Sequence, residues 1–209
     1  YARAKNLTFA VAMNLRFHPV VKKVKKFLSE GTIGKVIWAR FLCSSYLPNW
    51  RPHQDYRTGY TTDPVSGGVL FDMIHEIDLA HHLLGTAVMG ASVTRKSGVL
   101  DTSAEDCADL IFLHAGGVHS SLHLDYVSKN AQRHFEIQGE SALIKGDLLA
   151  RHMSCIGAEG KIMAGETYPG GFADDYAAEM KSFLSVMRSG SGEICAAGEA
   201  FEVLKTVIS

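Results

Sequence analysis

The sequence predicts an α+β fold: an open, mostly antiparallel β-sheet with helices on one face, preceded by a strand-helix unit that resembles the end of another α/β domain. Two hairpins predict the sheet. Residues 106–128 are typical of two strands that turn at Gly116 and Gly117, and residues 133–147 are typical of a second hairpin. Strands and helices do not alternate regularly along the 209 residues, which excludes a doubly wound domain.

The start of the chain predicts a strand, a helix and a second strand. Residues 8–13 form an apolar run that is typical of a short buried strand. Pro19 suits the first turn of a helix, and Gly31 suits its left-handed end. Residues 35–46 follow as a strand. The apolar side of the predicted helix consists of Val20, Val24, Phe27 and Leu28.

A long loop and an apolar segment come next. Residues 47–68 are polar and aromatic and contain three prolines. Loops of this length are uncommon inside compact domains and tend to be functional. We interpret Gly68 to Leu84 as one helix.

The second arm of the first hairpin alternates between two faces. One face is apolar and is expected to be covered, whereas the other is polar or available to a partner. His119 and His123 share the polar face, where we favour exposed or interface histidines over a metal site. The apolar face carries Val118, Ser120, Leu122, Leu124 and Tyr126, and the polar face carries His119, Ser121, His123 and Asp125.

The last part of the chain predicts an amphipathic helix from about Phe172 to Arg188. We interpret its aromatic and methionine stripe as core. A further helical stripe, in residues 196–209, has no capping residue at its end, and the chain opens without methionine, so we expect a fragment of a longer protein. The stripe of the helix from about Phe172 to Arg188 consists of Tyr176, Met180, Phe183, Leu184 and Met187.

Composition excludes several classes of function. A formal charge of −1 and a pI near 6.9 argue against nucleic acid as a partner, and the lysine run of the first helix is typical of a solvated face. No apolar run is long enough to span a membrane, and no signal peptide is visible, which favours a cytoplasmic protein. The four cysteines form no CxxC pair and are expected to be free thiols.

The stretch SGGVLFDMIHEIDLAHHLLG, residues 66–85, suggests either a metal site or a proton-transfer site. An HExxH zinc motif would need a ligand where this chain has Leu79. His75, Asp78 and His82 share one helical face, so a metal-dependent hydrolase is an alternative. Because the spacing does not match the zinc motif, we assign no metal site.

Proton transfer suits the same stretch better. Asp72 and His75 are three residues apart and would project from one side of a helix. A carboxylate near an imidazole favours its protonated form and can bring its pKa close to the working pH. Gly67 and Gly68 allow the backbone to approach a ligand. A half-buried histidine paired with aspartate for structure is equally compatible with these residues.

Three segments resemble, in order, the carboxyl-terminal portion of the Gfo/Idh/MocA oxidoreductases: MNLRFHPVVKKVKKFLSEGTIGKV, the glycine-led stretch above and DDYAAEMKSFLSVMRSG. The resemblance runs from about Thr8 to the end. It implies NAD(P)-dependent hydride transfer on a sugar or nucleotide-linked sugar. It also implies that residues 1–31 end a Rossmann domain, and that residues 32–209 form a substrate domain that oligomerises through its exposed sheet face.

The resemblance implies roles for individual residues. His75 matches the histidine that exchanges a proton with the substrate hydroxyl. Asp72 matches a nearby carboxylate, although many members place it one residue earlier, where this chain has Phe71. Asn14 and Arg16 match positions near the nicotinamide and the substrate. Our candidates for sugar contacts, in a loop (SYLPNWRPHQDYR) that resembles a branch associated with surface-polysaccharide sugars, are Trp50, Tyr56 and Arg57.

Two motifs of such enzymes do not occur in this chain. A GxGxxG turn, which would hold the pyrophosphate of NAD or NADP, is missing, and so is the EKP lysine. The main cofactor site therefore lies outside this chain, and we expect the fragment alone to be inactive. The alternative is a non-catalytic module that binds a sugar or oligomerises.

Overall fold

The computed structural model describes residues 2–208 and confirms the predicted sheet, which has eight strands. These are β2 (Val36–Tyr46), β3 (Ala87–Arg95), β4 (Cys107–His114), β5 (His119–Asp125), β6 (Val127–Gly139), β7 (Leu143–Asp147), β8 (His152–Ile156) and β9 (Ile162–Thr167). Their order is β3-β4-β5-β2-β6-β7-β8-β9. Neighbours are antiparallel except β2 and β5, which are parallel.

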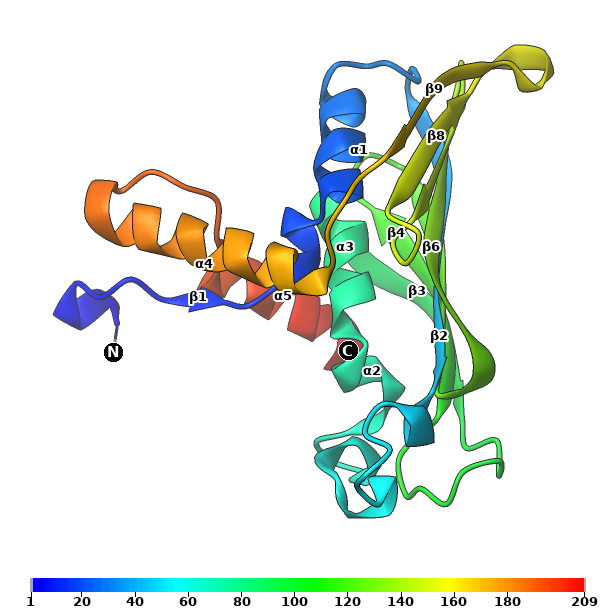
Figure 1. Ribbon diagram of the computed structural model, residues 1–209, viewed down its shortest axis with the longest axis vertical. Helices are drawn as coiled ribbons and strands as arrows, with labels where there is room; N and C mark the ends of the chain where they lie inside the picture. The colour runs from blue at the N-terminus through cyan, green and yellow to red at the C-terminus, as the bar shows by residue number, and fades with distance from the viewer. Residues whose placement is uncertain (1, 209) are drawn as a thin grey trace.

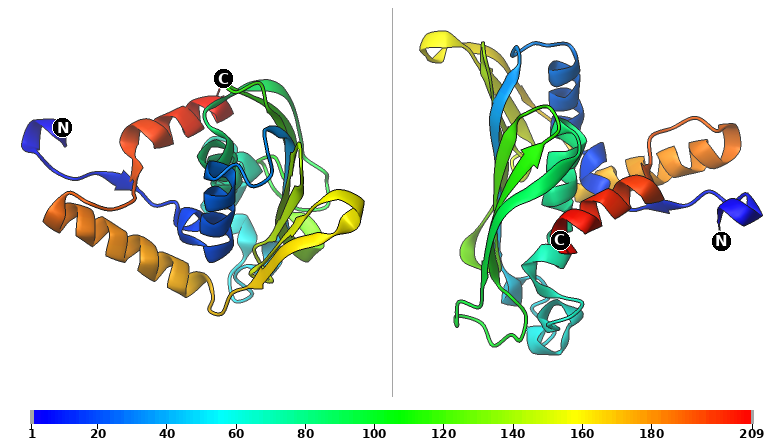
Figure 2. Two further views of the ribbon diagram at one scale, coloured as in Figure 1. Left: turned by 90° about the horizontal axis from the view of Figure 1, so that it is seen from above. Right: turned by 180° about the vertical axis from the view of Figure 1, so that it is seen from behind.

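The helices lie on one side of this sheet, and α4 and α5 extend away from it (Figure 1). The opposite face of the sheet carries no helix in any of the three views (Figure 2). The helices are α1 (Pro19–Ser29), α2 (Gly68–Asp72), α3 (Ile74–Leu84), α4 (Phe172–Ser189) and α5 (Ala197–Ile208). Short 3₁₀ turns occur at Arg3–Lys5, Asn14–Phe17, Leu47–Asn49, Tyr56–Thr58, Tyr60–Thr62 and Ala158–Gly160.

The hydrophobic core lies between the sheet and helices α1 and α3. Val20, Val21 and Val24 of α1 are fully buried in the same cluster as the inner face of the sheet. α1 contacts β7 and β8 directly. Helix α1, which precedes the predicted boundary at residue 31, thus packs on the same core as the sheet, and the boundary itself stays a prediction.

Both predicted hairpins are present. β4 and β5 are antiparallel and turn through Gly117, whose φ of +79° is a conformation that glycine adopts without strain. β6 and β7 pair around Gly139. Along β5, Ser120, Leu122 and Leu124 are buried on the helix side, as the alternation predicts.

The strand predicted at residues 8–13 is wrong in length and in burial. Only Ala10–Val11 (β1) is a strand, and it pairs with Cys195–Ala196 (β10), a two-residue strand outside the large sheet. Both residues of β1 are half-buried, and Phe9 is 56% exposed. An apolar run indicates a tendency to be buried, but it does not specify the surface that covers it.

The interpretation of the α4 stripe as core is also wrong for the described chain. Tyr176, Met180 and Met187 are each more than half exposed, and Leu184 is 38% exposed. α4 contacts the turn at Asn14–Phe17 and otherwise stands away from the sheet (Figure 2). Amphipathic periodicity predicts a partner surface for this helix, and residues 2–208 do not provide one.

The cysteines and the helices of the described chain have two further features. All four cysteines are free in the described chain. No helix among residues 2–208 has the length and apolar character needed to cross a lipid bilayer.

His18, the residue that caps the N-terminus of α1, is held in its neutral form by burial. His18 is fully buried, its Nδ1 accepts from the amide of Val20, and its Nε2 lies 3.2 Å from the carbonyl oxygen of Leu148. Burial lowers its pKa to about 4. Burial likewise lowers the pKa of His81 to about 4 and that of His82 to about 3.

These shifts predict acid destabilisation. An unfolded histidine titrates near 6.5, so the unfolded chain binds more protons than the folded chain between about pH 6.5 and 4, and stability falls as the pH drops through that window. His18→Asn keeps a capping acceptor but cannot titrate. We expect it to reduce the slope of melting temperature against pH without abolishing it, because burial also lowers the pKa of His81, His82 and His114. The same change at exposed His53 is the control, and an equal effect of both variants would contradict the assignment.

Candidate active site

A break between two helices positions the predicted acid–base pair. The single helix expected from Gly68 to Leu84 is interrupted at Met73, whose φ of −97° and ψ of 26° end α2 before α3 begins. Asp72 is thus the last residue of α2, and His75 is the second residue of α3. The predicted continuous helix is wrong, because the buried Met73 departs from helical geometry, but both side chains still line one pocket.

This pocket has a volume of about 280 Å³ and opens between α2, α3 and the strands β2 and β6. Its size suits one small molecule. The residues that define its character are Ser45, Trp50, Asp72, His75, Gln132, Arg133 and Phe172.

His75 carries an unused hydrogen-bonding atom in this pocket. Its Nδ1 is buried and has no hydrogen-bond partner among residues 2–208. A buried polar atom without a partner is unfavourable, and such atoms in native structures are often completed by water or a ligand. The ring as a whole is half-buried and lines the pocket, and its Nδ1 is the ring atom that the described chain leaves without a partner.

Asp72 is held by two tyrosines. The hydroxyl of Tyr60 donates to Oδ1 at 2.6 Å, and the hydroxyl of Tyr126 donates to Oδ2 at 2.9 Å. The hydrogen bond to Asp72 raises the pKa of Tyr60, and burial followed by the charge of Asp72 raises that of Tyr126. Both phenols stay protonated donors, so they fix the orientation of the Asp72 carboxylate in the pocket that His75 also lines.

A buried ion pair forms another wall. Arg133 Nε donates to Glu76 Oε1 at 2.5 Å, and Glu76 is 2% exposed. Burial alone would lower the pKa of Arg133, but the charge of Glu76 and the hydrogen bond to it raise that pKa above its usual value. Arg133 is a permanent cation at the pocket, and within the described chain it uses only Nε for hydrogen bonds. The rest of its guanidinium remains available to a ligand.

The predicted sugar contacts occupy different places. Trp50 lines the pocket of His75, packs edge-on against Tyr126 with ring centroids 5.4 Å apart, and also lines an adjoining pocket of about 120 Å³. Tyr56 lines only the adjoining pocket. Arg57 is exposed and forms a two-pronged ion pair with Asp55. The structure therefore brings Trp50 next to His75 and Asp72, but not Tyr56 or Arg57.

The predicted cofactor residues lie away from this pocket. Arg16 is 4% exposed, and its guanidinium makes three hydrogen bonds to Asp78 at 2.6–3.2 Å and one to Glu199 at 2.5 Å. It lines another pocket, with His81 and His82. Asn14 is buried in the turn that precedes α1. These contacts account for Arg16 as a structural residue, and its role toward a cofactor or substrate stays a prediction.

The alternative metal set does not assemble. His75 faces the pocket, both oxygens of Asp78 accept from Arg16, and both ring nitrogens of His82 lie 3.0–3.2 Å from Lys25 Nζ. A metal ion needs its ligands at one point. The three side chains therefore give no support to a metal-dependent hydrolase.

Sequence reasoning missed four residues of the site: Tyr60, Tyr126, Glu76 and Arg133. Tyr126 was expected only as an apolar residue of a strand, and Arg133 only as the start of a hairpin. Both contact partners more than 50 residues away, namely Asp72 and Glu76. The one local signal was the HE pair itself, because a buried glutamate requires a cation.

The comparisons with known proteins agree with this fold. The family described as GFO/IDH/MocA C-terminal domain matches residues 21–145, more than half of the chain. The chain belongs to this family. Levoglucosan dehydrogenase of Pseudarthrobacter phenanthrenivorans is 33% identical over 84 residues, which are 39% of this chain and 21% of that protein. D-apiose dehydrogenase of Paraburkholderia graminis is 25% identical over 125 residues, which are 58% of this chain and 31% of that protein.

A solved structure of levoglucosan dehydrogenase in complex with NADH has the same fold. It superimposes with a TM-score of 0.83 at 18% identity and covers 97% of this chain and 63% of that chain. The chain spans less than two thirds of the length of each of these relatives.

The buried contacts of Arg16 predict a structural effect of its removal. Arg16→Met leaves the buried Asp78 without its cation, so we expect the free energy of unfolding to fall by about 3–5 kcal/mol, measured by urea denaturation. A second change, Asp78→Leu, should recover most of that loss. Arg57→Met, at an exposed ion pair, is the control. If Arg16→Met is as stable as the wild type, the structural role of Arg16 is contradicted and a ligand-binding role is favoured.

Proposed function

We propose that this chain is the substrate-binding and acid–base domain of an NAD(P)-dependent oxidoreductase. The enzyme would move a hydride between a nicotinamide and a carbon that carries a hydroxyl or keto group in a sugar or nucleotide-linked sugar. One observation carries the proposal: the buried, unpartnered ring nitrogen of His75 in a pocket that also presents Asp72, Arg133 and Trp50. The names of the relatives, which are sugar dehydrogenases, support the reaction class.

Each pocket residue has a separate role in the proposed reaction. A nicotinamide cofactor, when bound, takes the hydride from the hydroxyl-bearing carbon or returns it. His75 takes the hydroxyl proton as the carbonyl forms, and gives it back in the reverse reaction. Asp72, fixed by its two tyrosines, presents hydrogen-bond acceptors at a constant position in the same pocket. Arg133 donates hydrogen bonds to substrate oxygens, and Trp50 offers an aromatic edge to a sugar ring.

The dinucleotide itself does not fit this chain alone. Residues 1–209 contain no glycine-rich turn of the kind that receives a pyrophosphate at a helix N-terminus. We therefore assign the main cofactor site, for NAD or NADP, to a nucleotide-binding domain outside these residues. The coverage of less than two thirds of each relative supports this assignment.

Replacing His75 tests the proposal. In the protein that includes the nucleotide-binding domain, with levoglucosan and D-apiose as the first probes, we expect His75→Ala to lower kcat by about 10²–10⁴. The melting temperature should hardly change, because His75 makes no hydrogen bond within the described chain. His53→Ala, an exposed histidine outside the pocket, is the control. Full turnover by His75→Ala would contradict the acid–base role.

We also propose that the uncovered sheet face binds a second copy of the chain. Four apolar side chains from β3 and β4 are 40–64% exposed on this face, which no helix covers. Exposed apolar clusters of this kind mark interaction sites. The four are Val88, Val93, Ile111 and Leu113.

A charge placed on this face should prevent the association. We expect Leu113→Arg to shift the protein from oligomer to monomer in sedimentation velocity, because an arginine would be buried against the apolar face of the partner. Val65→Arg, at a loop residue that is 81% exposed, should leave the distribution unchanged. A wild-type chain that sediments as a monomer at micromolar concentration would contradict the proposed association.

A further inference from the structure

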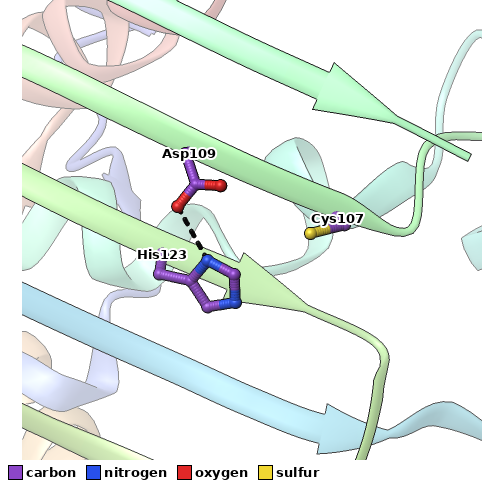
Figure 3. Close-up of side chains that lie close together, drawn as sticks. All are labelled: Cys107, Asp109 and His123. Carbon is purple, nitrogen blue, oxygen red and sulfur yellow. Dashed lines mark hydrogen bonds and ion pairs between the residues drawn. The ribbon is translucent and has the colours of Figure 1, made fainter. Parts of the chain in front are cut away.

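A compact group of metal-ligating side chains lies on the uncovered face of the sheet, outside the pocket of the candidate active site. Cys107 and Asp109 are on β4, and His123 is on β5 (Figure 3). One ligand atom from each of the three lies within 4.8 Å of the others. The strand register explains the grouping: Asp109 is directly opposite His123, and Cys107 is directly opposite Asp125. Directly opposed residues of an antiparallel pair hold their side chains on the same face.

The imidazole of His123 is oriented by carboxylates at both nitrogens. Its Nδ1 lies 2.8 Å from Asp109 Oδ1, and its Nε2 lies 3.2 Å from Asp125 Oδ2. Asp109 is largely exposed and mobile in principle, whereas Asp125 is 2% exposed. The two carboxylates therefore differ in burial. Of the two, only the exposed Asp109 has room to exchange its hydrogen bond to His123 for another ligand.

Asp125 is fixed by the turn that follows β5. Its Oδ1 accepts from the backbone amides of Val127 and Ser128 at 2.8 and 2.7 Å, and its Oδ2 accepts from the Ser128 hydroxyl at 2.9 Å. Histidines that bind metals typically donate their second N–H to a carboxylate held in this way, which sets the tautomer and the direction of the other nitrogen. Asp125 gives His123 that arrangement and leaves Nδ1 directed toward Asp109 and Cys107.

The local charge favours a cation at the same point. Two carboxylates, Asp109 and Asp125, contact the imidazole of His123, and Arg95 is the basic residue opposite Cys107 on β3. A divalent cation would neutralise the carboxylates and stabilise the thiolate.

We propose that Cys107, Asp109 and His123 bind a divalent zinc-type metal ion, with water as the fourth ligand. Thiolate, imidazole and carboxylate are the three donor types that zinc accepts, whereas magnesium and calcium bind oxygen. Ligand bonds near 2.0–2.3 Å place tetrahedral donors roughly 3.4 Å apart. The present separations of up to 4.8 Å require only small rotations of the exposed Asp109 and of Cys107. The proposal does not depend on the oxidoreductase assignment.

The experiment uses cobalt(II) as a coloured substitute for zinc. Purified protein, stripped of metal with a chelator, is titrated with Co²⁺, and competition with Zn²⁺ gives the zinc affinity. We expect one ion per chain and a thiolate-to-cobalt absorption band in the near ultraviolet. Cys107→Ser should abolish the band, and Asp109→Asn should weaken zinc binding by at least about tenfold.

Two controls separate this site from other cysteines and from surface histidines. His119→Ala removes an exposed histidine from the same strand and face, and Cys155→Ala removes a buried thiol of the core. Both variants should keep the band and the zinc affinity. Absence of a cobalt–thiolate band in the wild type, or its persistence in Cys107→Ser, would overturn the proposal and leave a hydrogen-bonded surface cluster only. Folding of each variant is checked by circular dichroism, and Asp109→Asn decides the matter if Cys107→Ser fails to fold.

Discussion

The packing of α3 against the centre of the sheet is the contact on which the candidate site depends. Ile77 and Ala80 are fully buried, and α3 contacts both β2 and β5. The polar residues of the helix are then fixed by partners from distant segments: Glu76 by Arg133 and Asp78 by Arg16. Breaking either buried pair leaves an uncompensated charge, which is far more costly than losing an exposed pair. Because the helix cannot rotate without breaking these pairs, His75 is held at the pocket.

The two faces of the sheet use polar residues in different ways. On the helix side, buried polar groups form two separate hydrogen-bonded groups at the pocket, Tyr126 with Asp72 and Glu76 with Arg133. On the uncovered side, strand register alone places donors next to one another, and solvent allows side chains such as Asp109 to move. The covered face therefore suits a preorganised reaction site, and the uncovered face suits binding of an ion or of a second chain.

Local patterns predicted the parts of the structure that depend on neighbours in sequence. Both hairpins and α1 with its proline followed from alternation and capping. The partners of Asp72 did not, because Tyr126 lies 54 residues away and carries no signal beyond its place on an apolar face. The metal-ligating group on β4 and β5 was also missed. His123 was considered with His119 on its own strand, whereas its neighbours Cys107 and Asp109 become visible only once the register between strands is known.

The α4 stripe was predicted to be core but is exposed. The cause of this error is different, and it is relevant to the proposed function. Periodicity showed that the helix needs an apolar partner, but it could not show that the partner is absent from residues 2–208. Phe172, at the start of α4, lines the pocket of His75, and Met180 and Phe183 line an apolar pocket with β1 and β10. One helix thus connects the candidate site to an uncovered apolar stripe, which consists of Tyr176, Met180, Leu184 and Met187. A nucleotide-binding domain packed on that stripe would lie next to the pocket, which is the arrangement that the proposed function requires.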